Sequence, residues 1–147
     1  MHADDAAAAS DAARRPAPLL APGQLFADVN SVSPGRKRAA AAAIGRAGGY
    51  LDLAIMAPVH PRRHQTPCLA AGPAAPAFVE TFRAFGMNLS VAGAEIGAAT
   101  QMKMVRSVMV KGLEALSYEC FAAARAAGVE AESLDSLQRS YPGTAWA

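Results

Sequence analysis

One lysine of this chain lies in an unusually apolar stretch, QMKMVRSVMVKGLEAL, which runs over residues 101–116. On an α-helix, four of the polar residues that follow Lys103 fall within about 80° on one side of it and form one narrow stripe, with Arg106 just beside it. They are Ser107, Lys111, Glu114 and Tyr118. A lysine in a mostly apolar helix needs a partner, a cleft or a lowered pKa, and an amine with a lowered pKa can exchange protons near neutral pH. Lys103 is therefore a candidate general acid–base.

This polar stripe admits two interpretations. It could face water while the rest of the helix is core, although a solvated face is usually wider and richer in charge. Alternatively, Lys103 and Ser107 open into a cleft, and Lys111 and Glu114 form a structural ion pair lower down the helix. A helix that is apolar nearly all round is usually buried, which favours the cleft. Gly93 precedes this helix and, like other small residues there, permits close approach of a ligand or simply of another backbone.

The elements that must position this helix alternate along the chain. Turn residues and apolar runs predict strands at 25–29, 50–58, 68–72 and 87–91, and helices at 3–14, 34–47, 73–86, 95–127 and 132–139. Ser33 is the expected N-cap of the second helix, Pro34 its first residue, and Gly48-Gly49 its end. The alternation predicts an α/β layer with mostly parallel strands. A helix of roughly 30 residues would be about 45 Å long, so it should link two bodies or two subunits.

Composition excludes several classes of protein. The chain has 147 residues, 52% of them apolar, so it can bury a core and is not a disordered protein. A net charge of +2 gives no basis for binding nucleic acid or a membrane surface. Cys68 and Cys120 form no metal-binding pattern, and His60 and His64 lie among prolines, so no metal site is expected. We expect two buried thiols and a cytoplasmic protein, since neither a signal peptide nor a transmembrane run is recognisable.

Four segments carry a family resemblance. They are FADVNSVSP, YLDLAIMAPVHP, TPCLAAGP and GAEIGAATQMKMVRSVMVKGLEALSYEC. In this order they resemble the β-hydroxyacid dehydrogenase family, which includes 3-hydroxyisobutyrate, tartronate semialdehyde and 6-phosphogluconate dehydrogenases. The resemblance covers roughly residues 15–147. It implies the C-terminal part of a Rossmann-like dinucleotide-binding domain at 1–92, and the start of an all-α domain, similar to the C-terminal domain of 6-phosphogluconate dehydrogenase, at 93–147.

The same resemblance implies roles for individual residues. Lys103 matches the catalytic lysine of the family. The positions that border the nicotinamide of NAD or NADP are Asn30, Ser31 and Val32. The substrate-binding positions are Met56, Ala57 and Pro58, together with Arg106 and Ser107. Arg62 or Arg63 could also bind a substrate carboxylate, or could simply be surface charges.

This sequence departs from the family in three ways. The substrate segment usually ends in Ser-Gly-Gly, whereas here it reads Met56-Ala57-Pro58, and Ser107 stands where an Asn is usual. The GxGxxG fingerprint that approaches the pyrophosphate is absent from the sequence. The expectation is therefore a fragment of a longer enzyme.

Two functions remain open at this point. The first is an NAD(P)-dependent oxidoreductase that transfers hydride between the nicotinamide and a small hydroxy acid, homodimeric when intact and impaired as this chain. The second is a non-enzymatic remnant whose long apolar helix is a dimerisation or interaction module.

Overall fold

The computed structural model describes residues 17–45 and 49–144. The predicted helix at 3–14 lies outside the described residues. The chain divides into two compact units, 1–105 and 106–147, and each is described by itself. The first unit contains the sheet and the second contains most of the long helix and the helix that follows it. None of the described helices is long and apolar enough to cross a membrane.

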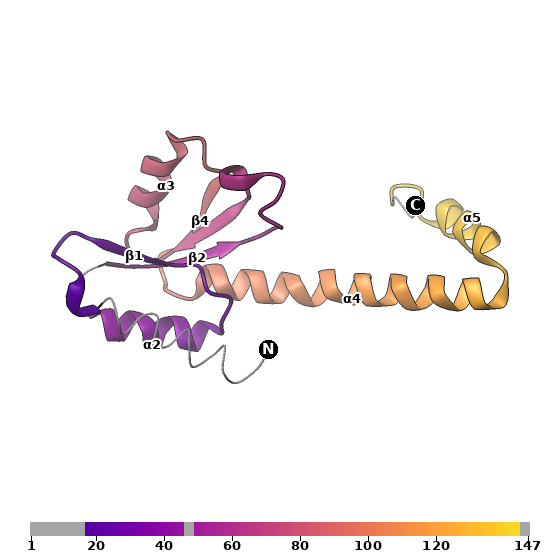
Figure 1. The fold of residues 1–147 in the computed structure, drawn as a ribbon, viewed down its shortest axis with the longest axis horizontal. Coiled ribbons are helices and arrows are strands. Elements are labelled where there is room, and N and C mark those ends of the chain that lie inside the picture. Colours follow the sequence, from indigo (N-terminus) through magenta and orange to yellow (C-terminus); the bar gives the residue numbers. More distant parts are fainter. Residues whose placement is uncertain (1–16, 46–48, 145–147) are drawn as a thin grey trace. The chain divides into compact units, whose positions relative to one another are not determined.

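The first unit is built on a four-stranded sheet (Figure 1). Its strands, in spatial order, are β1 (Leu25–Asp28), β2 (Gly49–Ile55), β3 (Cys68–Ala71) and β4 (Leu89–Gly93). β1 and β2 are parallel, as are β3 and β4, but β2 and β3 are antiparallel. The expectation of mostly parallel strands holds for two pairs. It is wrong for the third because the connection 56–67 contains only the short 3-10 helix η2 (Arg63–Gln65), and a parallel crossover usually needs a longer helix.

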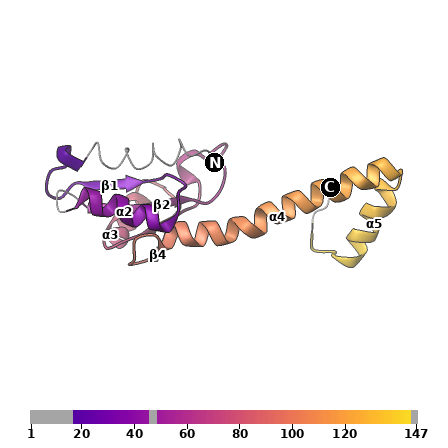
Figure 2. The same cartoon turned by 90° about the horizontal axis from the view of Figure 1, so that it is seen from below.

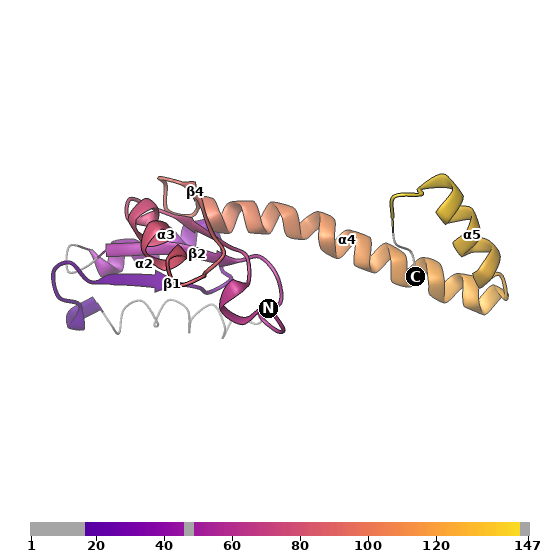
Figure 3. The same cartoon turned by 90° about the horizontal axis from the view of Figure 1, so that it is seen from above.

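The two faces of the sheet are covered by different helices. α3 (Ala75–Arg83) covers the face that carries Leu51 and Leu53 of β2, and Figure 3 shows α3 over this side. α2 (Pro34–Ile44) packs through Ile44 against Tyr50 on the opposite face, as seen from below in Figure 2. Because side chains alternate along a strand, Asp52 points to the same side as Tyr50. β2 is thus buried on both faces, and one face receives a buried carboxylate.

The ends of α2 follow from local chemistry. Ser33 is the N-cap as predicted, because its side chain accepts a hydrogen bond from the Arg36 amide, and Pro34 is the first residue. The predicted end at Gly48-Gly49 is wrong, since α2 ends at Ile44. Gly49 instead begins β2, where a Cβ would lie 2.8 Å from the Leu25 side chain. A larger residue there would require the Leu25 side chain to move.

The remaining α-helices are α4 (Ala98–Ala127) and α5 (Glu130–Ser140). A short 3-10 helix, η1 (Ala17–Leu19), lies before β1. The 30-residue α4 confirms the predicted long helix, and α5 is slightly longer than predicted. Gly128 separates them with a φ of +72°, which glycine adopts at no steric cost.

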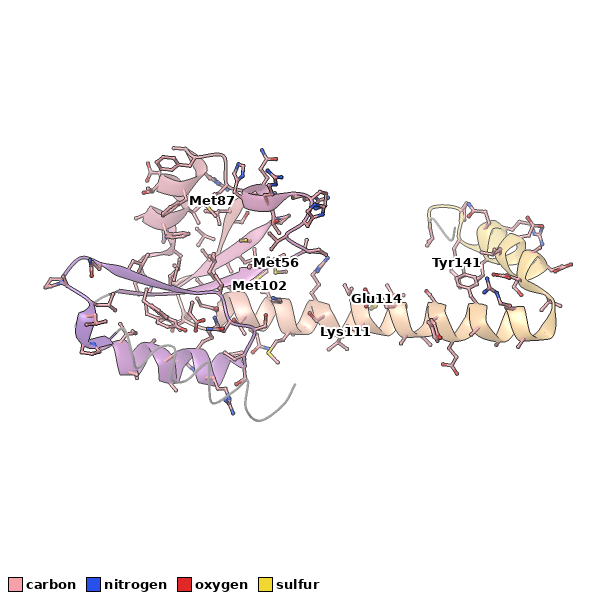
Figure 4. The ribbon with its side chains drawn as sticks, viewed as in Figure 1. Met56, Met87, Met102, Lys111, Glu114 and Tyr141 are labelled. Carbon is pink, nitrogen blue, oxygen red and sulfur yellow. The ribbon has the colours of Figure 1, made fainter. Side chains whose placement is uncertain are left out.

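Three expectations about α4 are wrong. Lys111 and Glu114, labelled in Figure 4, make no ion pair among the described residues, and both are exposed. Cys120 is exposed, although Cys68 is buried as predicted. The apolar side chains of α4 are also exposed within this chain rather than buried: Met102, Met104, Val105, Val108, Met109, Leu113 and Leu116. The pattern indicated burial because it cannot tell which surface would cover the helix.

Candidate functional site

The feature that organises the site is a hydrogen bond between α4 and the segment after β1. The Lys103 amine donates to the Ser31 hydroxyl, with 2.8 Å between Nζ and Oγ. β1 and β2 are parallel and in register from Leu25 to Asp28, so their carboxyl ends meet at one edge of the sheet. Residues 72 positions apart in sequence therefore meet where parallel strands end, which is the usual place for a ligand in an α/β sheet.

The Lys103 amine is chemically distinct. Burial lowers its pKa, and the nearby charge of Lys37 lowers it further, while Cys68 acts in the opposite direction. In turn, burial raises the pKa of the Cys68 thiol, and Lys103 partly offsets that rise. A lysine with a lowered pKa is more often uncharged near neutral pH, so it can accept a proton as well as donate one.

This property predicts selective acylation. With limiting acetic anhydride near neutral pH, Lys103 is expected to react faster than Lys111, because only the uncharged amine attacks the reagent. Peptide-level mass spectrometry measures both rates in the same sample, so Lys111, which is more exposed, is the internal reference. Slower acylation of Lys103 than of Lys111 across the pH range would contradict a lowered pKa.

Beneath this contact lies a buried cluster of charges. Lys37 of α2 is fully buried and lies between Asp28 at the end of β1 and Asp52 in the middle of β2. Its Nζ lies 3.2 Å from Asp28 Oδ1 and 3.5 Å from Asp52 Oδ1, and it donates to the Asp28 carbonyl at 2.6 Å. A buried charge is costly unless it is paired and hydrogen-bonded. Each of the two carboxylates also accepts hydrogen bonds from further donors.

Those further donors tie the cluster to the rest of the site. The Tyr50 hydroxyl donates to Asp28 Oδ2 at 2.5 Å, and burial together with this bond raises the Tyr50 pKa, so the phenol keeps its proton. Asp52 accepts from the Thr100 amide at 3.0 Å and from its hydroxyl at 2.7 Å. Thr100 lies in the first turn of α4, whose amides have no partner within the helix. Asp52 therefore anchors the start of α4 three residues before Lys103.

The Asp28 carboxylate makes the stability of the fold depend on pH. Burial alone would raise its pKa, but hydrogen bonds from Tyr50 and Asn30 and the charge of Lys37 outweigh burial, so its pKa lies below 3.8. A carboxylate whose pKa is lower in the folded chain than in the unfolded chain stabilises the fold at pH values above its unfolded-state pKa. The stabilisation is lost as the pH falls from 3.8 through the folded-state pKa.

Acid unfolding tests this dependence. Between about pH 5 and about pH 2.5, the free energy of unfolding should fall less in Asp28→Asn than in the unchanged chain, as measured by urea denaturation at each pH. The matched control is Asp135→Asn, which removes an exposed carboxylate that pairs with Arg139 on α5. Equal slopes for the Asp28→Asn variant and the unchanged chain would rule out the assigned role of the Asp28 carboxylate.

The structure brings some of the sequence-predicted residues to this edge. Asn30 and Ser31 are exposed there, whereas Val32 is buried and its side chain belongs to the core. Met56 follows β2 and packs on the cluster around Ala99 of α4, beside the first turns of that helix in Figure 4.

Other predicted residues lie elsewhere. Ala57 and Pro58 continue into the loop before η2, and Pro58 is exposed. Arg62 lines a surface hollow of about 480 Å³ together with Gln65 and Asn88. Arg106 and Ser107 of α4 fall in the unit 106–147.

Sequence reasoning missed the buried cluster. Asp28 and Asp52 appeared only as single acidic residues within apolar strands, and Lys37 as one charge in a basic run at the start of a helix. A charged residue inside a strand that is otherwise apolar on both faces is itself a signal, because it must find a buried partner. The partner could not be named from the sequence, since it comes from a different element.

Comparisons with known proteins bear on this geometry. The chain has a TM-score of 0.79 and 33% identity to a conserved protein of unknown function that is structurally similar to 3-hydroxyacid dehydrogenases, covering 92% of this chain and 51% of that one. The chain shares its fold with proteins resembling 3-hydroxyacid dehydrogenases. A conserved hypothetical protein from Sinorhizobium meliloti is 43% identical with a TM-score of 0.77, over 95% of this chain and 47% of that one. No protein-family model matches the chain.

The similarity extends to enzymes that bind nicotinamide cofactors. An imine reductase from Myxococcus stipitatus, solved in complex with NADP+, is 25% identical with a TM-score of 0.65, over 81% of this chain and 43% of that one. A variant of this reductase was solved in complex with NAD+. The chain is thus related to NAD(P)-dependent oxidoreductases, and it spans about half the length of the proteins it matches. The resemblance recognised in the sequence is confirmed at this level.

Proposed function

We propose that this chain supplies part of the active site of an NAD(P)-dependent oxidoreductase that acts on a small hydroxy acid, with Lys103 as the general acid–base. The observation that carries the proposal is the half-buried Lys103 amine held by Ser31 at the carboxyl edge of β1 and β2. Its lowered pKa supports the same role. The relation to NAD(P)-dependent oxidoreductases supports the reaction class.

The chemistry needs two transfers from an alcohol. A hydride leaves the carbon for the nicotinamide, which supplies the electron acceptor when bound. The hydroxyl proton goes to the uncharged Lys103 amine, so that the carbonyl product forms without a free alkoxide. In the reverse direction the ammonium of Lys103 returns this proton to the carbonyl oxygen. Ser31 holds the amine in place at this edge.

The residues present fit the nicotinamide end of a dinucleotide. Asn30 and Ser31 are exposed polar residues, and Ser31 accepts a hydrogen bond from Lys103; we propose that both border the nicotinamide. Val32 contributes packing beneath them because its side chain is buried. The sequence offers no GxGxxG turn for the pyrophosphate, so we expect this chain alone to bind NADH or NADPH more weakly than micromolar.

The substrate would meet the loop that follows β2. We propose that the segment Met56-Ala57-Pro58 lines its site. For Arg106 and Ser107 of the unit 106–147, the proposed substrate contact rests on the family resemblance alone, with Arg106 pairing with a carboxylate. Met56 packs against the buried cluster of Ala54, Ala71 and Ala99, which fits a wall of the site.

The test uses a chimera, defined as the Sinorhizobium meliloti protein with its matched region replaced by residues 1–147. NADPH and NADH are titrated into the chain and the chimera while nicotinamide fluorescence is followed, and small hydroxy acids are then screened for NAD(P)H formation. We expect binding and turnover by the chimera. Micromolar binding by the chain alone would contradict the weak-binding expectation. A chimera that binds either cofactor but oxidises no hydroxy acid would overturn the proposed substrate class.

A second candidate function rests on a separate observation. The unit 106–147 exposes Val108, Met109, Leu113 and Leu116 on α4, which is more apolar surface than a helix in water usually carries. We propose that this surface is covered in a homodimer. Sedimentation equilibrium gives the mass of the unchanged chain and of the Val108→Glu variant in solution. A monomeric unchanged chain would exclude this function.

A further inference from the structure

We propose that Lys37 is a positioning residue for Lys103: held between Asp28 and Asp52, it fixes the segment 28–31 so that the Ser31 hydroxyl meets the Lys103 amine. The proposal rests on the proposed function only for the importance of Lys103. The hydrogen bonds and ion pairs that carry it are independent of any substrate.

Lys37 reaches its partners from the first turn of α2. α2 begins at Pro34, immediately after the segment that follows β1, and Lys37 is its fourth residue. Its side chain turns back by nine positions and donates to the Asp28 carbonyl at 2.6 Å. One ammonium therefore closes a short loop of main chain, with β1 at one end and the first turn of α2 at the other.

Hydrogen bonds to Asp28 fix the segment inside that loop. Asp28 Oδ1 accepts from the Asn30 amide at 2.9 Å and from the Asn30 side chain at 2.8 Å. The same oxygen lies 3.2 Å from Lys37 Nζ. The Val32 amide then donates to the Asn30 carbonyl at 3.2 Å, so successive residues on both sides of Ser31 are held.

The position of the Ser31 hydroxyl depends on this arrangement. Ser31 is exposed, so packing does not fix its hydroxyl, and its position follows from the main chain on either side. The opposite partner, Lys103, is fixed through Asp52, which receives two hydrogen bonds from Thr100 at the start of α4. Asp52 also lies 3.5 Å from Lys37, so one buried cluster sets both ends of the Lys103–Ser31 contact.

The test observes the contact directly, without substrate. Lysine is labelled with ¹³C at Cε, which gives at most three lysine signals because the chain has only Lys37, Lys103 and Lys111. The Lys103 signal and the Ser31 amide are followed by NMR from neutral to alkaline pH. In the unchanged chain we expect the Ser31 amide to shift with the same midpoint as Lys103, and Lys103→Met to abolish that shift.

The deciding variants remove Lys37. In Lys37→Met the Ser31 shift should lose most of its amplitude, whereas the matched control Lys111→Met should keep it. The double variant Lys37→Met/Asp28→Asn removes one positive and one negative charge, so the net charge is unchanged. It tests the positioning role of Lys37 if the single variant fails to fold.

The outcomes separate a positioning role from a merely structural one. Loss of the Ser31 shift in a variant with a cooperative unfolding transition supports positioning. A full-amplitude Ser31 shift in folded Lys37→Met/Asp28→Asn, or no Ser31 shift in the unchanged chain, would overturn it. None of these readings depends on turnover, so failure of the proposed reaction leaves the inference standing, and the reverse also holds.

Discussion

Replacing Lys103 with alanine is expected to lower the kcat of the chimera by at least about 100-fold, the low end of what general acid–base catalysis contributes. The alanine variant has no group at this position that can take the alcohol proton during hydride transfer. Cofactor affinity should change little, since the proposed nicotinamide neighbours, Asn30 and Ser31, remain. Stopped-flow or steady-state assay of NAD(P)H formation gives kcat, and fluorescence titration gives the cofactor Kd.

Two further variants show which property of Lys103 matters. Lys103→Arg keeps a positive charge but cannot release a proton, so it should be almost as impaired as the alanine variant. Lys111→Ala removes an exposed lysine from the same helix and should leave kcat unchanged. Turnover close to that of the unchanged chimera in Lys103→Ala would remove this lysine from catalysis. High activity of Lys103→Arg would show that charge alone suffices.

Replacing Lys37 with methionine is expected to lower the free energy of unfolding by about 3–5 kcal/mol, the range for breaking a buried ion pair. Methionine keeps most of the aliphatic volume, so the cost arises from the two carboxylates. Asp28 and Asp52 are 3% and 0% exposed and would be left without their shared cation. Urea denaturation followed by circular dichroism measures the change.

The controls for this prediction separate charge from packing. Lys111→Met makes the same substitution at an exposed site and should change stability by no more than about 0.5 kcal/mol. Lys37→Met/Asp28→Asn should recover much of the loss, because removing both charges of a buried pair is often close to neutral. If the double variant is as unstable as the single one, the cost comes from lost packing around Lys37 instead.

These two predictions concern residues that sequence reasoning treated very differently. Lys103 could be found from the sequence because it stands among methionines and valines, where a charge needs an explanation, and because it matches a family position. Strand β1, strand β2, helix α2 and helix α4 were also predictable, since apolar periodicity and the Ser33-Pro34 start are local signals. Periodicity also led to wrong expectations, as the exposed apolar side chains of α4 show.

What the sequence by itself determined is the order and type of the elements, the likeness to hydroxyacid dehydrogenases and the candidate lysine. Only the tertiary structure decided the antiparallel join of β2 and β3, the Lys103–Ser31 bond and the buried cluster of Lys37, Asp28 and Asp52. The physical reason is the range of the interactions. Caps and periodic burial depend on neighbours within a few residues, whereas a buried charge is stabilised by partners from other elements, which come together only when the sheet has formed.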